Sequence, residues 1–158
     1  MSACQTCAAG WAAGYAAAAC ALCPAGSVGP SPGLWGCQAC GAWTVAPRAG
    51  MSACLACADG YLWPGTSGAA CTACPGGTYN AGGNTATACT VCTAGTYAVA
   101  PAGACQLCPQ NTYAAAAQAS ACLPCASPQI TLAAGATRCA YPYGGRYLAA
   151  CPPDFYCA

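Results

Sequence analysis

The sequence has almost no charged residues. Its 158 residues include three arginines and two aspartates, and there is no lysine, glutamate or histidine. Nucleic-acid binding needs a basic surface that neutralises phosphates, which the scattered Arg48, Arg138 and Arg146 do not supply. General acid–base catalysis needs a histidine or a pair of carboxylates, and Asp59 and Asp154 are far apart in the chain. We therefore expect no nucleic-acid partner, no enzymatic activity and no cofactor.

Large apolar side chains are scarce as well. The chain has eight leucines, two methionines, one phenylalanine and one isoleucine, against 43 alanines, 20 glycines and 13 prolines. The hydrophobic fraction of 58% therefore consists mostly of alanine and cysteine, which fill little volume. We predict a fold without a conventional hydrophobic core. The uncharged stretch 8–22 is too short and too weakly apolar to cross a bilayer, so we expect no membrane span in this chain.

A surface with so little charge lacks the electrostatic repulsion that keeps soluble proteins apart. We therefore expect the surface to be covered, either by neighbouring subunits or by neutral sugars. Ser31 lies between Pro30 and Pro32 and is the candidate site for O-linked glycosylation.

Cysteine is what the chain has in abundance. Its 19 cysteines amount to about 12% of the residues, a density typical of disulfide-stapled proteins in oxidising, extracellular compartments. Sixteen of them form doublets of the form C-x-x-C, and the first cysteines recur every 16 to 18 residues as far as Cys139. The doublets are Cys4/Cys7, Cys20/Cys23, Cys37/Cys40, Cys54/Cys57, Cys71/Cys74, Cys89/Cys92, Cys105/Cys108 and Cys122/Cys125. Such a fixed period predicts a tandem array.

The residues after each doublet follow a common pattern, clearest between Cys71 and Cys125. The third position favours residues that tolerate positive φ: Gly10, Gly26, Gly60, Gly77, Gly95 and Asn111. The next one or two positions carry aromatic or β-branched residues: Trp11, Val28, Tyr61, Tyr79, Tyr97, Tyr113 and Ile130, with Trp43, Thr44 and Val45 in the corresponding place. Each repeat is thus predicted to form a turn, a short strand, a second turn and a return strand that ends at the next cysteine.

Three arrangements of the cysteines compete. A bridge inside a C-x-x-C doublet is typical of redox enzymes, whose βαβ pattern is missing from the sequence. Four thiolates around each Zn²⁺ would leave about −2 of charge per site, which three arginines cannot offset. A bridge from the second cysteine of one doublet to the first cysteine of the next closes a loop of 12 to 14 residues. For such a loop, chain entropy predicts that the disulfide stabilises the fold by about 3 kcal/mol.

The segment Cys74-Pro75-Gly76-Gly77-Thr78-Tyr79…Cys89 resembles the cysteine-rich repeats of TNF-receptor-like and ephrin-receptor-like ectodomains, which also occur in surface proteins of algae and other protists. The resemblance covers residues 54–139 closely and 4–53 more loosely. It implies the pairs Cys7–Cys20, Cys23–Cys37, Cys40–Cys54, Cys57–Cys71, Cys74–Cys89, Cys92–Cys105, Cys108–Cys122 and Cys125–Cys139. We further expect Cys151 to pair with Cys157, which leaves Cys4 unpaired or bonded to another chain.

The expected architecture is therefore a small disulfide-rich, elongated array of β-hairpin repeats of about 17 residues, with little helix. Residues 1–139 form eight repeats, and 140–158 form a divergent C-terminal segment or the start of a further repeat. Because MSAC opens the sequence and recurs at Met51, we expect the chain to be part of a longer array. Such arrays suit an extracellular stalk or filament that self-associates, and the alternative is a ligand-binding ectodomain.

Overall fold

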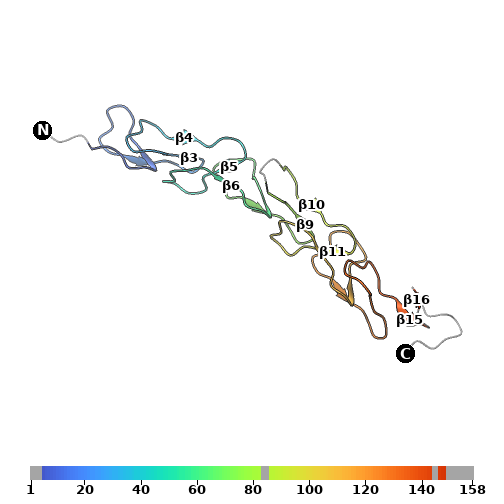
Figure 1. Ribbon diagram of the computed structural model, residues 1–158. Coiled ribbons are helices and arrows are strands. Elements are labelled where there is room, and N and C mark those ends of the chain that lie inside the picture. The colour runs from blue at the N-terminus through green and yellow to red at the C-terminus, as the bar shows by residue number, and fades with distance from the viewer. Residues whose placement is uncertain (1–4, 83–85, 144–145, 149–158) are drawn as a thin grey trace. The chain divides into compact units, whose positions relative to one another are not determined.

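A computed structural model of the chain describes residues 5–82, 86–143 and 146–148. These residues contain no helix, and therefore none that could cross a membrane. Their strands are all two or three residues long. Figure 1 labels several of them along the chain. The strands are β1 (Trp11–Ala12), β2 (Ala21–Leu22), β3 (Ser27–Val28), β4 (Gln38–Ala39), β5 (Thr44–Val45), β6 (Leu55–Ala56), β7 (Tyr61–Leu62), β8 (Thr72–Ala73), β9 (Thr78–Tyr79), β10 (Thr90–Val91), β11 (Thr96–Tyr97), β12 (Gln106–Leu107), β13 (Thr112–Tyr113), β14 (Leu123–Pro124), β15 (Tyr141–Tyr143) and β16 (Arg146–Leu148).

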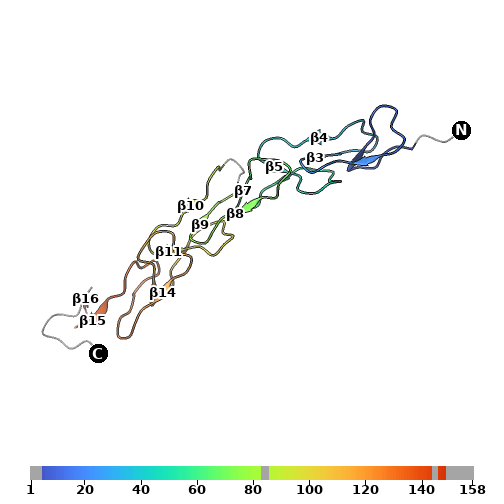
Figure 2. The same ribbon diagram turned by 180° about the vertical axis from the view of Figure 1, so that it is seen from behind.

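Each odd-numbered strand pairs with the strand that follows it, so the described residues form eight two-stranded sheets. Antiparallel pairing places Trp11 opposite Leu22 in β1–β2 and Thr96 opposite Leu107 in β11–β12. Figures 1 and 2 show β9 and β10 side by side in both views. In the eighth repeat an isolated bridge between Ile130 and Ala140 takes the place of the hairpin. The predicted small disulfide-rich tandem array is confirmed.

The return strand lies later in the chain than the sequence pattern predicted. We expected it to end at the next cysteine, but β2 follows Cys20 and fills the two positions between Cys20 and Cys23. The Cys7–Cys20 disulfide holds the two ends of the loop together, with a Cα–Cα distance of 5.6 Å. The amide of Cys23 then donates to the carbonyl of Gly10 at 2.9 Å. The two x residues of each doublet are thereby held extended between two fixed points.

The turn before the first strand explains the Gly-Thr-Tyr pattern. Gly77 has φ +78°, and the amide of Thr78 donates to the carbonyl of Pro75 at 3.1 Å, as in a type II turn. The Thr78 hydroxyl donates to the same carbonyl at 2.7 Å, so threonine stabilises the turn twice. The same pair of bonds is formed by Thr96 and by Thr112.

Trp43 departs from its predicted place in a strand. It takes the turn position with φ +69°, and the strand β5 starts one residue later at Thr44. Its ring packs against Trp63 with a centroid distance of 5.2 Å, and the Trp63 indole N–H donates to the Thr44 carbonyl at 3.2 Å. Packing against a second large ring is a physical reason why a bulky residue is held in a backbone conformation that usually needs glycine.

Disulfide sulfur occupies the interior of the fold. The largest fully buried side chains among the described residues are Cys23, Cys74, Cys92 and Cys108. All four are second cysteines of doublets, whereas both x residues are exposed in the return strands from β2 to β14. Beside these cysteines the described residues bury small aliphatic side chains, among them Val28, Val45 and Ala46.

The chain divides into two compact units. The first falls within Met1–Ala58, Leu62–Thr72 and Gly82–Thr87, and the second within Asp59–Tyr61, Ala73–Ala81 and Ala88–Ala158. Both units are built from the same hairpin repeat, so each can be described on its own.

Candidate functional site: repeat junctions and exposed return strands

Eight disulfides join each second cysteine of a doublet to the next cysteine along the chain, which is the first of the following doublet or, for Cys125, the single Cys139. Their Cα–Cα distances range from 5.5 to 5.8 Å, which is ordinary disulfide geometry. The pairs are the eight that the resemblance implied: Cys7–Cys20, Cys23–Cys37, Cys40–Cys54, Cys57–Cys71, Cys74–Cys89, Cys92–Cys105, Cys108–Cys122 and Cys125–Cys139. Cys4, Cys151 and Cys157 lie outside the described residues, so their pairing stays a prediction.

The charged side chains whose exposure the structure describes are scattered and solvent-exposed. Arg48, Asp59 and Arg138 are all exposed. Within the described ranges no three histidine, cysteine or acidic residues come close enough to hold a metal ion. Ser31 is exposed in a bend, where a glycosyltransferase could reach its hydroxyl, and its glycosylation stays a prediction.

Consecutive repeats are joined by backbone hydrogen bonds. In the second unit the amide of Gly77 donates to the carbonyl of Ala98, and the amide of Gln118 donates to the carbonyl of Cys92, both at 2.8 Å. In the first unit the Gly10 amide donates to the Gly29 carbonyl and the Gly50 amide to the Cys23 carbonyl, again at 2.8 Å. Because backbone groups make these contacts, the loop side chains can vary from repeat to repeat without loss of the junction.

The turn glycines also touch the repeat after next. A Cβ atom added to Gly77 would collide with the backbone carbonyl of Gln118, some forty residues further on. Gly95 approaches Gly135 in the same way, and Gly10 approaches Gly50. Glycine is therefore required here for two reasons, its positive φ and the absence of a side chain. The sequence pattern indicated the first reason and gave no sign of the second.

Asn80 forms a buried polar contact that the sequence analysis did not identify. It is 6% exposed, and its side-chain amide donates to the carbonyl of Tyr61 at 2.6 Å. Its own backbone carbonyl accepts from the Gly60 amide, and its backbone amide donates to the Ala102 carbonyl. Asn80 thus links three repeats of the second unit. The signal in the sequence that could have indicated this contact is the polar residue directly after Thr-Tyr.

We expect Asn80→Ala to destabilise the second unit by about 1–3 kcal/mol, because the partly buried Tyr61 carbonyl would lose its donor. Hydrogen exchange at the amides of Gly60 and Asn80 should accelerate accordingly. Gln106→Ala is the matched control, because its side-chain oxygen accepts a bond from the Tyr97 hydroxyl on the exposed surface. Equal protection in both variants would contradict a structural role for Asn80.

The return strands present an open edge with apolar side chains. The residues that flank the first strand of a hairpin form backbone hydrogen bonds with the next repeat. Gly10 and Ala13 do so on either side of β1. The return strand has no partner on its other side within the two-stranded sheet. Pro124, which has no N–H to donate, lies in a return strand, β14, as expected for an open edge. The exposed residues on these strands include Leu22, Leu55, Val91, Leu107 and Leu123, which are 46 to 62% exposed.

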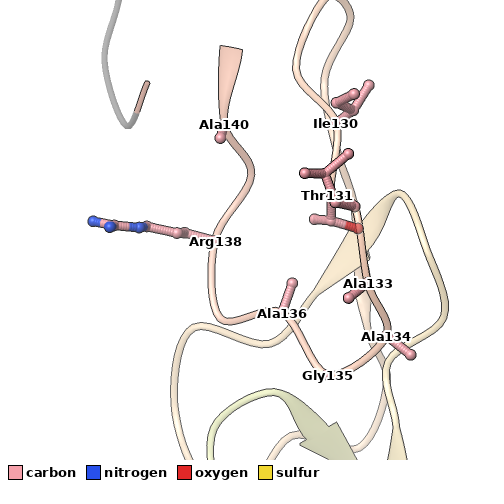
Figure 3. A pocket seen from close by; sticks show the side chains of 9 residues that line it. Ile130, Thr131, Ala133, Ala134, Gly135, Ala136, Arg138 and Ala140 are labelled. Atoms are coloured by element: carbon pink, nitrogen blue, oxygen red, sulfur yellow. The ribbon is translucent and has the colours of Figure 1, made fainter. Parts of the chain in front are cut away.

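A solvent-open hollow of about 350 Å³ lies between the two limbs of the loop of the eighth repeat. Figure 3 shows Ile130 and Thr131 on one limb and Ala136 and Ala140 on the other, while the Arg138 side chain extends away from the loop. Four of the nine lining residues are alanine, and the polar side chains among them are those of Thr131 and Arg138. This hollow has no arrangement of groups for catalysis.

Residues 95–140 match the family described as tyrosine-protein kinase ephrin type A/B receptor-like. The matched segment begins just before β11 and contains the disulfides Cys108–Cys122 and Cys125–Cys139. No curated protein sequence matches the chain significantly. The chain therefore contains an ephrin-receptor-like cysteine-rich module among its tandem repeats. Together with the many disulfides, this module is typical of extracellular domains.

Proposed function

We propose that this chain is a structural segment of an extracellular filament or stalk, and that it associates side by side with further copies of itself. The observation that supports this most directly is the open edge of the return strands. It recurs in successive repeats, and carries exposed leucine and valine side chains. Edges of this kind are a ready template for contact with another chain unless charge protects them.

The charge distribution supports self-association. Soluble proteins protect open edges with lysine or other charges, and this chain has no lysine. The Leu107 and Leu123 side chains lie in consecutive return strands of the second unit and are 62% and 56% exposed. Covering such side chains with the same strands of another copy would remove apolar area from water without burying any charge.

The proposed association is tested with Leu107→Lys/Leu123→Lys in the full oxidised chain. We expect the double variant to associate at least about tenfold more weakly, or ~1.4 kcal/mol, in sedimentation equilibrium. Small-angle scattering should give a radius of gyration clearly above the ~15 Å of a compact globule of this length.

Leu132→Lys is the matched control, because Leu132 is 56% exposed but lies outside any return strand. It should leave association nearly unchanged. A wild-type chain that stays monomeric up to about 1 mM, or a control as damaging as the double variant, would refute the proposal.

A ligand-binding ectodomain is the second candidate. The match of residues 95–140 to ephrin-receptor-like modules favours it, because such modules are found in receptors. Under this alternative a soluble partner would bind reversibly and protect one face of the second unit from hydrogen exchange.

A further inference from the structure

Two aromatic rings of the first unit stand together on the surface. The Tyr15 and Trp35 side chains are 88% and 73% exposed, with ring centroids 6.3 Å apart and planes 31° from parallel. The other close aromatic pair of this unit, Trp43 and Trp63, is only partly exposed and uses its indole N–H inside the fold. Among the described residues, neither the Tyr15 hydroxyl nor the Trp35 indole N–H has a hydrogen-bond partner. This pair therefore leaves both its ring faces and its polar atoms available.

The backbone around the two rings is held in place. The Ala13 amide donates to the Leu34 carbonyl at 3.0 Å, which ties the loop of Tyr15 to the loop of Trp35. The Gly33 amide donates to the carbonyl of Cys7 at 2.8 Å, beside the Cys7–Cys20 disulfide. A ligand that binds in the hollow beside the rings would consequently lose little entropy in ordering the loops.

The rings border a hollow of about 420 Å³, within the size range of small-ligand sites. Its lining includes Gln5 and Thr6, two exposed residues that carry an amide and a hydroxyl group. None of the lining residues that the structure describes carries a charge. The site thus combines two aromatic faces with neutral hydrogen-bonding groups at its margin.

We propose that this hollow, the Tyr15–Trp35 site, binds a neutral saccharide. A pyranose ring has faces of C–H groups that pack against aromatic rings and a rim of hydroxyls that both donate and accept hydrogen bonds. Tyr15 and Trp35 match the faces, while Gln5 and Thr6 match the rim. An acidic sugar would find no cation in the lining. A proline-rich peptide also stacks on aromatic rings, but it needs an extended groove and offers no hydroxyl rim for Gln5 and Thr6.

The proposal is tested by titrating the full oxidised chain with cellohexaose, mannohexaose and chitohexaose, while the Trp35 indole and Gly33 amide signals are followed by NMR. We expect at least one of these neutral oligosaccharides to shift both signals with a Kd of about 1 mM, the weak end of specific binding. Tyr15→Ala and Trp35→Leu should each weaken that binding by at least about tenfold, the latter because leucine keeps apolar bulk but has no aromatic face.

Val99→Ala changes an apolar residue of the second unit that is 65% exposed, and it should leave saccharide binding unchanged. The Gly33 amide of Tyr15→Ala should stay protected from exchange, which shows that the loops remain in place. Absence of a shift with all three oligosaccharides would overturn the proposal. So would stronger binding of decaproline than of any sugar, or saccharide binding that survives both aromatic substitutions.

Discussion

Reduction of the disulfides is expected to unfold both units completely. The largest fully buried side chains are cysteines, so reduction would replace the covalent interior by thiols, with only small aliphatic residues such as Val45 and Ala46 buried beside them. Each disulfide closes a loop with a sequence separation of 13 to 15, for which chain entropy predicts about 3 kcal/mol. The stabilisation lost with all eight disulfides would exceed the 5–15 kcal/mol by which folded domains are typically stable.

The measurement is hydrogen exchange at the amides of Cys23, Cys74 and Cys92. Each of these amides closes a hairpin by donating to the carbonyl of a turn glycine. In the oxidised chain these amides should exchange slowly, and after reduction and alkylation they should exchange at the rate of an unfolded peptide. The control is the oxidised chain exposed to the same alkylating reagent. Retained protection after complete alkylation would show that hydrogen bonds and small side chains suffice, contrary to our account.

Replacement of Gly77 by alanine is expected to destabilise the second unit strongly for the addition of a single methyl group. The left-handed backbone conformation costs a non-glycine residue about 1–2 kcal/mol. The added methyl would also push against the Gln118 carbonyl, and overpacking of this kind costs roughly 1–3 kcal/mol. We therefore expect Gly77→Ala to lower the unfolding free energy of the second unit by about 2–5 kcal/mol in total.

Gly65→Ala separates these two costs. Gly65 has φ +86°, but nothing lies within 4 Å of the position that its Cβ would take. The Gly65→Ala variant should therefore lose about 1–2 kcal/mol of unfolding free energy, from the backbone conformation alone. The readout is the change in exchange protection at Cys92, whose amide donates to the Gly77 carbonyl, and at amides near Gly65 for the control. Equal losses in the two variants would mean that the contact between Gly77 and Gln118 carries no energetic weight.

The local structure of each repeat was predictable from the sequence because it depends on residues close together in the chain. The spacing of the doublets limits each disulfide to a loop of similar length, and glycine at the third position indicates a turn with positive φ. The aromatic and β-branched residues that follow were assigned to strands, and Trp11, Tyr79 and Tyr113 lie in β1, β9 and β13. Trp43 was misplaced because its turn conformation is accompanied by packing against Trp63, twenty residues away.

Contacts between repeats were decided by the tertiary structure alone. The approach of Gly77 to Gln118, the bond from Asn80 to Tyr61 and the pairing of Tyr15 with Trp35 each join residues from different repeats. These contacts depend on how far one repeat is rotated and shifted from the next. That geometry follows from backbone hydrogen bonds between loops, which leave no periodic mark on side-chain type. The sequence by itself thus determined the covalent frame and the hairpin of each repeat, while the packing of repeats determined which surfaces remain open for binding.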